Sequence, residues 1–134
     1  MKKKTVIIST IIVLAVLLVG GYMLFDNIFP KAKPIEKLEF NKLESVALSD
    51  NENNEITISD TELQKLIVSI NDAEATRTMS VNDYPVVRPY YVLEIKTSER
   101  VFRYMIYEDN GVVYAELPYE GVYRIDSEIM EFVR

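Results

Sequence analysis

Residues 101–117, VFRYMIYEDNGVVYAEL, decide the fold of the C-terminal part of this chain. In both halves of this stretch apolar or aromatic residues recur at alternate positions, which is the period of a β-strand. Asn110-Gly111 lies between the halves and favours a type I′ turn, because both central residues of that turn need positive φ. The stretch therefore predicts two antiparallel strands, Val101–Tyr107 and Val112–Leu117, joined by a tight hairpin.

Neighbouring segments extend this hairpin into a sheet. Both faces of Val101–Tyr107 are apolar or aromatic, so we expect this strand to lie in the middle of the sheet. Tyr90–Thr97 alternates in the same way and predicts the preceding strand. Pro118–Gly121 is a turn candidate, and Val122–Ile125 after it predicts the final strand. Further strands are predicted within Leu38–Leu48, Glu55–Ile58 and Ala73–Met79.

Two helices complete the predicted domain. Ser59, followed three residues later by Glu62, forms a capping box that starts a helix ending near Asn71. Asp126-Ser127 caps a short C-terminal helix. This order of elements predicts an α+β fold, a small two-layer domain with an antiparallel meander sheet, one main helix and a short C-terminal helix. The main helix carries one apolar stripe at i, i+3, i+4 and i+7, formed by Leu63, Leu66, Ile67 and Ile70.

A separate apolar segment opens the chain. Thr5–Phe25 holds 21 residues without a charge and follows Lys2, Lys3 and Lys4. As a helix it measures about 31 Å, the hydrocarbon thickness of a bilayer. The lysines predict a cytoplasmic N-terminus and a C-terminal domain outside the cell. A cleaved signal peptide is the alternative, although no Ala-x-Ala site follows, and the absence of Cys excludes a lipid anchor.

These boundaries predict four parts of the chain. They are a basic cytoplasmic N-terminus (1–4), a transmembrane helix (5–25) that contacts the lipid bilayer, a linker (26–36) and an extracytoplasmic α+β domain (37–134). The linker holds two prolines and mixed charges, which is typical of a spacer.

Composition excludes several classes of function. The formal net charge is −6, and without the three N-terminal lysines 12 basic residues face 21 acidic ones, a net charge of −9. Nucleic acid needs a positive field, so we expect no nucleic-acid partner. The chain has no His and no Cys, which excludes Ser-His-Asp and Cys-His catalysis, ordinary zinc sites and disulfides. We expect no cofactor and no metal.

Tyrosine is concentrated in the predicted sheet, where eight of the nine tyrosines lie between Tyr84 and Tyr123. Pairing across strands is the structural explanation of this cluster. The functional explanation is an exposed aromatic platform on the sheet face without helices, and Tyr107, Tyr114 and Tyr119 are its binding candidates. The partner of such a platform would be another protein or a cell-envelope component.

Two other functions stay open at this point. An immunity or inhibitor protein at the membrane surface needs no catalytic equipment and fits the predicted anchor. A small carboxylate-dependent glycan hydrolase needs two acidic residues with separated pKa values. Acidic residues lie on or beside the predicted sheet at Glu94, Glu108, Glu116 and Glu120, and their spacing selects no pair. We expect a protein that is not an enzyme.

Three stretches carry a family resemblance, namely SVNDYP (80–85), YMIY (104–107) and YAELPYEGVY (114–123). With them the chain resembles a family of small exported proteins of unknown function from Gram-positive bacteria, whose members carry an N-terminal anchor or a lipoprotein signal. The resemblance covers roughly residues 37–134. It implies the fold and an exported location, and it brings no activity and no functional residues.

Overall fold

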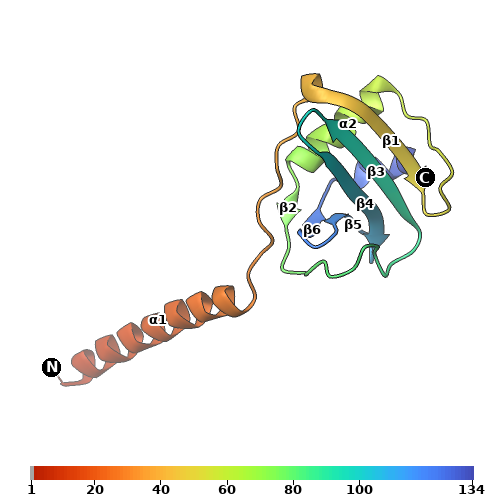
Figure 1. Ribbon diagram of the computed structural model, residues 1–134. Helices are drawn as coiled ribbons and strands as arrows, with labels where there is room; N and C mark the ends of the chain where they lie inside the picture. The colour runs from red at the N-terminus through yellow and green to blue at the C-terminus, as the bar shows by residue number, and fades with distance from the viewer. Residues whose placement is uncertain (1) are drawn as a thin grey trace. The chain divides into compact units, whose positions relative to one another are not determined.

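The structure is a computed structural model that describes residues 2–134 (Figure 1). The chain forms two compact units: the first ends at Lys31, and the second begins at Ala32. The first unit contains helix α1, Lys2–Ile28. Its side chains from Lys3 onward are almost all exposed, including nearly every large apolar one. From Lys3 to Ile28 this helix is long and apolar enough to cross a membrane.

The second unit is built on one six-stranded antiparallel sheet, in the order β1-β3-β4-β5-β6-β2 (Figure 1). The strand β4 lies inside the sheet between β3 and β5, as its two apolar faces predict. With two helical elements beside the sheet, the α+β fold is confirmed. The strands are β1 (Leu43–Asp50), β2 (Glu74–Ala75), β3 (Tyr90–Thr97), β4 (Val101–Asp109), β5 (Val112–Leu117) and β6 (Gly121–Arg124).

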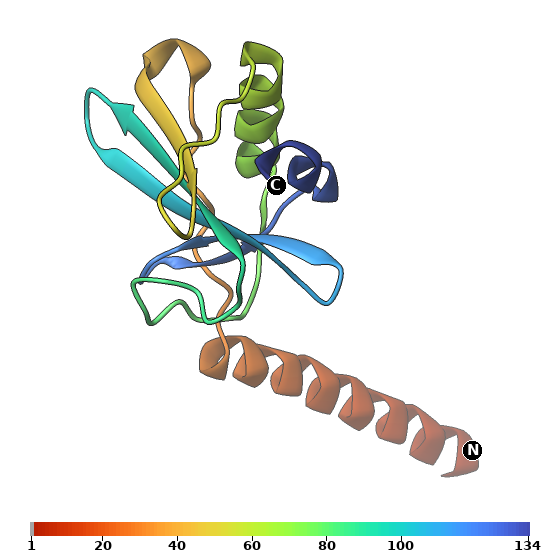
Figure 2. The ribbon, with the colours of Figure 1, turned by 90° about the vertical axis from the view of Figure 1, so that its right-hand side faces the viewer.

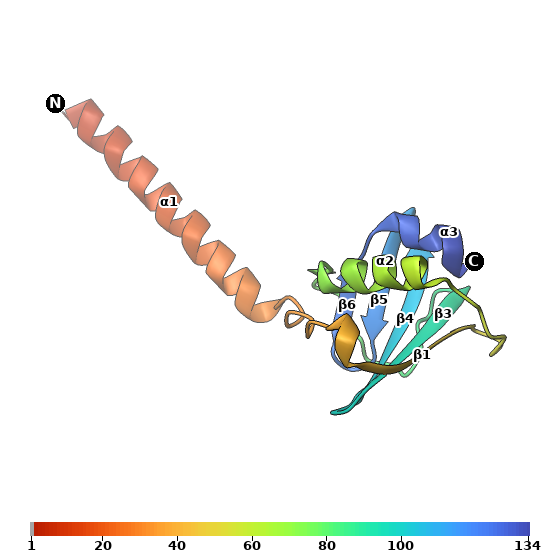
Figure 3. The same ribbon diagram turned by 90° about the horizontal axis from the view of Figure 1, so that it is seen from above.

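Helices cover one face of this sheet. Helix α2 (Asp60–Asn71) and the C-terminal 3-10 turn with helix α3 (Met130–Val133) lie side by side over the strands (Figures 2 and 3). Leu66 and Ile70 of α2 are fully buried, as the apolar stripe predicts. Each such side chain contributes about 1.5–3 kcal/mol relative to leaving it exposed. The strands supply the other half of this core with Leu93, Ile95, Phe102, Tyr104, Ile106, Val113 and Ala115.

The opposite face of the sheet is covered without regular secondary structure. Residues 76–89, which we name the covering loop, connect β2 to β3 and contribute Val87 to a second, smaller cluster. This cluster contains buried Tyr90, Met105 and Tyr107, with Val92 and Tyr114 packed against them.

The β4–β5 hairpin has the predicted geometry. Asn110 has a φ of 51° and Gly111 a φ of 78°, so both central residues of the turn are left-handed. Asp109 pairs with Val112 directly across the turn. The prediction of a two-residue Asn-Gly turn is confirmed.

Two predicted strands differ from the structure. The return strand Glu55–Ile58 is reduced to a single bridge between Ser49 and Glu55. The reason is the Asp50 side chain, which accepts hydrogen bonds from the backbone of Glu52 and Asn54 and closes a loop instead. These hydrogen bonds also lower the pKa of Asp50, chiefly through its contacts with Asn54. The opening strand begins only at Leu43, because a 3-10 turn occupies Phe40–Lys42.

The predicted linker is also shorter in the structure. Helix α1 continues to Ile28, and the compact unit already begins at Ala32, whose backbone N–H donates to Thr76 at 2.9 Å. Ile35 and Leu38 are buried because their apolar side chains join the main core. Residues 32–38, which we name the docked segment, are therefore part of the folded domain.

Candidate functional site

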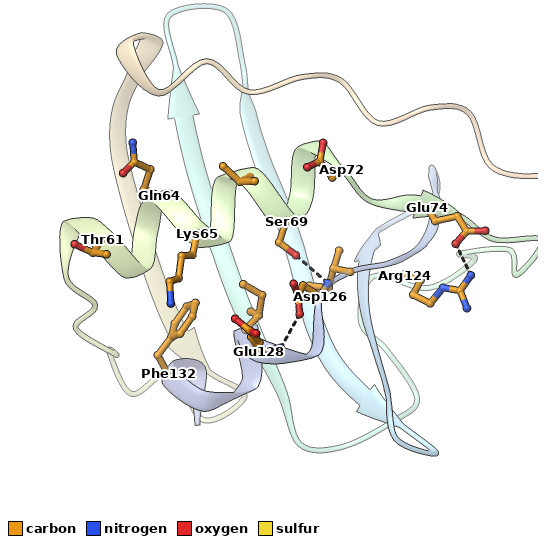
Figure 4. A pocket seen from close by; sticks show the side chains of 13 residues that line it. Thr61, Gln64, Lys65, Ser69, Asp72, Glu74, Arg124, Asp126, Glu128 and Phe132 are labelled. Atoms are coloured by element: carbon orange, nitrogen blue, oxygen red, sulfur yellow. Dashed lines mark hydrogen bonds and ion pairs between the residues drawn. The ribbon is translucent and has the colours of Figure 1, made fainter.

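A groove of about 710 Å³ lies between α2 and residues 125–133, which we name the C-terminal segment (Figure 4). Its walls come from one face of α2 and from the residues that follow β6. Figure 4 shows Lys65 of α2 and Phe132 of the C-terminal segment pointing toward each other across it. It is lined by Thr61, Gln64, Lys65, Val68, Ser69, Asp72, Glu74, Arg124, Ile125, Asp126, Glu128, Ile129 and Phe132.

Local sequence positions the helical wall. The Ser59 side chain accepts from the backbone of Glu62, and the Glu62 carboxylate accepts from the backbone of Ser59 at 2.7 Å. This reciprocal cap starts α2 and lowers the pKa of Glu62. The buried stripe then turns Val68 outward into the groove, where its exposed fraction is 53%.

Two hydrogen bonds position the C-terminal wall. The backbone N–H of Asp126 donates to the Ser69 hydroxyl of α2 at 2.9 Å. The Asp126 carboxylate in turn accepts from the backbone N–H of Glu128 at 2.9 Å and caps the 3-10 turn Ser127–Ile129. Ile129 and Met130 are buried beneath this turn. The two walls are therefore joined directly.

The groove is acidic. Its lining contains two cationic and four anionic side chains, a net charge of −2. Arg124 pairs with Glu74 at one end, and Asp72 contacts Lys37 at 3.8 Å. Among residues 2–134, no ion pair joins Asp126 or Glu128 to a cation. Exposed apolar surface therefore lies beside carboxylates that have no ion pair.

Within the part of the chain that the structure describes, no three His, Cys, Asp or Glu side chains are grouped to hold a metal ion. Each of the four acidic residues considered for a hydrolase has its own partner or is buried. Glu94 pairs with Arg103, Glu108 with Arg134 and Glu120 with Arg100, whereas Glu116 is buried on the loop-covered face.

The predicted aromatic platform is only partly exposed. Tyr107, Tyr114 and Tyr119 do avoid the helix-covered face, but Tyr107 is buried at 7% exposure and Tyr114 is half-buried. The expectation that Tyr107 is exposed is wrong, because the covering loop packs over it. Tyr107 and Tyr114 instead form a cross-strand pair with ring centroids 5.7 Å apart. Tyr119 alone of the three is exposed, at 66%.

The covering loop is attached to the sheet by a buried polar contact. The Ser80 hydroxyl donates to the Glu116 carboxylate at 2.6 Å and accepts from the backbone N–H of Tyr119 at 3.2 Å. Burial and the neighbouring Glu116 carboxylate, to which the phenol is hydrogen-bonded, raise the pKa of Tyr107. The Tyr119 hydroxyl donates to Asp83 at 2.8 Å, which raises the pKa of that phenol. We name the contacts of Ser80 with Glu116 and Tyr119, together with the Tyr119–Asp83 hydrogen bond, the polar latch.

The docked segment reaches the same turn from the other side. The Tyr123 hydroxyl donates to the carbonyl of Lys33 at 2.8 Å. A side chain at Gly121 would meet the Cβ of Ala32 at 2.4 Å, so this close approach requires glycine. Residues 116–123, which belong to the stretch YAELPYEGVY (114–123), thus hold both the covering loop and the docked segment.

Sequence reasoning missed the groove. Val68 is apolar but falls off the predicted stripe of α2, and this mismatch was the available signal. Phe132 lies in the predicted C-terminal helix, and its local pattern does not mark it as part of a groove. Glu128 carried no local signal, because its position beside Asp126 and α2 depends on how the chain returns after β6.

The structure thus combines an apolar N-terminal helix with an antiparallel α+β domain. The chain belongs to the family DUF5301, described as a domain of unknown function (DUF5300), whose sequence profile matches residues 28–124. The matched region ends at Arg124, so the C-terminal wall of the groove lies outside it. No curated protein matches the chain.

A solved structure is similar to the domain. The NMR structure of a protein from Ruminococcus gnavus superposes with a TM-score of 0.55 at 26% sequence identity. The similarity covers 72% of this chain and 97% of the other. The other protein therefore shares the fold over almost its whole length.

Proposed function

We propose that this chain is a single-pass membrane protein that presents a non-catalytic binding domain outside the cytoplasm. The observation that carries the proposal is the surface of α1. Its apolar side chains are exposed along the whole helix, and a bilayer would remove them from water. An aqueous environment for the same surface would be unfavourable.

The proposed orientation rests on charge. Lys3 and Lys4 precede the apolar part of α1, and positive residues are retained on the cytoplasmic side. The domain after Ala32 carries 11 basic and 20 acidic side chains, a net charge of −9. This charge disfavours a domain that lies flat on anionic lipid.

The groove between α2 and the C-terminal segment supports a binding role for the domain. It combines exposed apolar surface with unpaired carboxylates, and its walls are preformed by the Ser69–Asp126 contact. Another protein or a cell-envelope component is the proposed partner. This surface replaces the tyrosine platform as the preferred binding site, because Tyr107 is buried.

Cysteine labelling tests the anchor and its orientation, since the natural chain has no Cys. Lys3→Cys and Val86→Cys are treated in intact cells with a membrane-impermeant maleimide. We expect labelling at position 86, where the exposed fraction is 86%, and labelling at position 3 only after permeabilisation. Labelling at position 3 in intact cells would contradict the orientation, and a mature protein without residues 5–25 would contradict the anchor.

A further inference from the structure

We propose that the groove binds a basic, amphipathic peptide segment of a partner protein. The inference rests on the proposed function, because it names the class of partner that the anchored domain takes. Three properties of the groove carry it: its exposed apolar surface, its unpaired acidic charge and its preformed walls.

The apolar property comes from both walls. Val68 is 53% exposed on α2, and Phe132 is only half-buried on the C-terminal segment. Ile125 and Ile129 line the groove between them and are already buried. Apolar side chains of a bound peptide would remove Val68 and Phe132 from water without any change in the core.

The acidic property selects the charge of the partner. Of the charged side chains that line the groove, Arg124 already pairs with Glu74 and Asp72 contacts Lys37, which leaves Asp126 and Glu128 against one cation without an ion pair among residues 2–134, Lys65. Lys or Arg side chains of a peptide would neutralise the two free carboxylates. An acidic peptide, a nucleic acid or an anionic headgroup would meet like charge instead. A second copy of this domain is disfavoured for the same reason, since its net charge is −9.

The preformed walls of the groove lower the free-energy cost of binding. The Ser69 hydroxyl bonds the backbone of Asp126, and the Asp126 carboxylate caps the turn that carries Glu128. The Asp126 carboxylate and the turn that carries Glu128 are therefore held at the groove before a partner arrives. A partner need not pay to order these elements.

The experiment uses the full chain in phosphatidylcholine nanodiscs, with a fluorophore on Gln64→Cys at the edge of the groove. A short amphipathic peptide of Leu and Lys is titrated against a peptide of the same pattern with Glu in place of Lys. Empty nanodiscs measure the partition of each peptide into lipid. We expect saturable binding of the Leu–Lys peptide beyond the lipid background, and no such binding of the Leu–Glu peptide.

Matched variants locate the binding site. Glu128→Lys should weaken binding about fivefold, the size expected for an exposed ion pair. Glu52→Lys makes the same charge change in an exposed loop that does not line the groove and should leave affinity unchanged. Val68→Ser should also weaken binding, whereas Val86→Ser in the covering loop should not.

Several outcomes would overturn the inference. Equal binding of both peptides would remove the role of charge, and equal losses in Glu128→Lys and Glu52→Lys would remove the groove. A signal no larger than that of empty nanodiscs would assign the peptide to the lipid. Each of these results leaves the cysteine labelling of positions 3 and 86 unaffected, so failure here is distinct from failure of the proposed anchor.

Discussion

The two faces of the sheet are covered by different means. On one face α2 and the C-terminal segment bury a continuous apolar core that includes Leu66, Leu93 and Ile106. On the other face the covering loop closes a much smaller cluster and is held by the Ser80–Glu116 contact. Apolar burial resists disruption in proportion to the area removed from water, whereas a few polar contacts contribute little each. We infer that the helix-covered face supplies most of the stability and that the loop-covered face opens separately.

Within the helix layer, we expect stability and the proposed binding to depend on different sides of α2. The inner side of α2 stabilises the core through Leu66 and Ile70, while its outer side presents Val68 to the groove. Substitutions on the outer side should therefore change binding without unfolding the domain.

The largest effect is expected on the helix-covered face. Leu66→Ala removes a fully buried side chain and leaves a cavity, which should lower the free energy of unfolding by about 2–5 kcal/mol. Urea unfolding of the full chain in detergent micelles, followed by circular dichroism, measures the change. Gln64→Ala on the exposed side of α2 is the control. A loss below about 1 kcal/mol for Leu66→Ala would contradict the assignment of the main core.

A smaller effect is expected for the polar latch. Ser80→Ala removes a hydroxyl partner of the buried Glu116 carboxylate and should cost about 1–3 kcal/mol. Ser127→Ala changes an exposed hydroxyl and serves as the control in the same unfolding assay. If Ser80→Ala and Ser127→Ala were equally stable, the latch would not hold the covering loop.

The turn between β4 and β5 predicts a loss of stability of similar or smaller size. Gly111→Val places a β-branched residue at a φ of 78° and should destabilise the domain by about 1 kcal/mol or more. The space around Gly111 is open, so the cost comes from the backbone and not from a clash. A melting curve unchanged by this substitution would count against the left-handed turn.

The smallest effect, and the only gain, is expected at Tyr104. Its hydroxyl is buried and has no hydrogen-bond partner within residues 2–134. Tyr104→Phe should therefore leave the domain equally stable or stabilise it by about 1 kcal/mol at neutral pH. A loss of more than about 1 kcal/mol in urea unfolding would show that this hydroxyl has a partner.

The same residue predicts a dependence on alkaline pH. Burial raises the pKa of Tyr104 above its ordinary value of 10.0 in the folded state. The unfolded chain releases this proton first, so stability is fully present below pH 10 and falls as the pH rises further. Tyr107, whose pKa is also raised by burial, contributes in the same direction from the other face. The fall should be shallower in Tyr104→Phe, and an unchanged slope would contradict the assignment.

Local patterns explain how much of the fold was predictable. The Asn110-Gly111 turn and the α2 cap each depend on neighbouring residues, so both were found in the sequence. The polar latch was not, because Ser80 and Glu116 are 36 positions apart and meet only when the covering loop crosses the sheet. The burial of Tyr107 was not predictable for the same reason, because the covering loop reaches it only when it crosses the sheet.

The sequence did not predict the docked segment or the groove, for a related reason. The two prolines of the predicted linker suggested a spacer, yet Ile35 and Leu38 bury themselves against the domain. The groove joins α2 to a segment that is more than 50 residues away in the sequence, through the Ser69–Asp126 contact. No spacing within either segment signals that contact.

Hydrogen exchange of two backbone amides in the full chain tests the difference between the faces most directly. The Tyr119 amide donates to the Ser80 hydroxyl of the latch, and Ile106 lies in β4 at the main core. Exchange is followed by NMR in micelles at increasing, sub-denaturing urea. We predict that Tyr119 exchanges by local opening, insensitive to urea, whereas Ile106 exchanges only by global unfolding and accelerates steeply. Equal urea dependence at both amides would contradict a loop-covered face that opens separately.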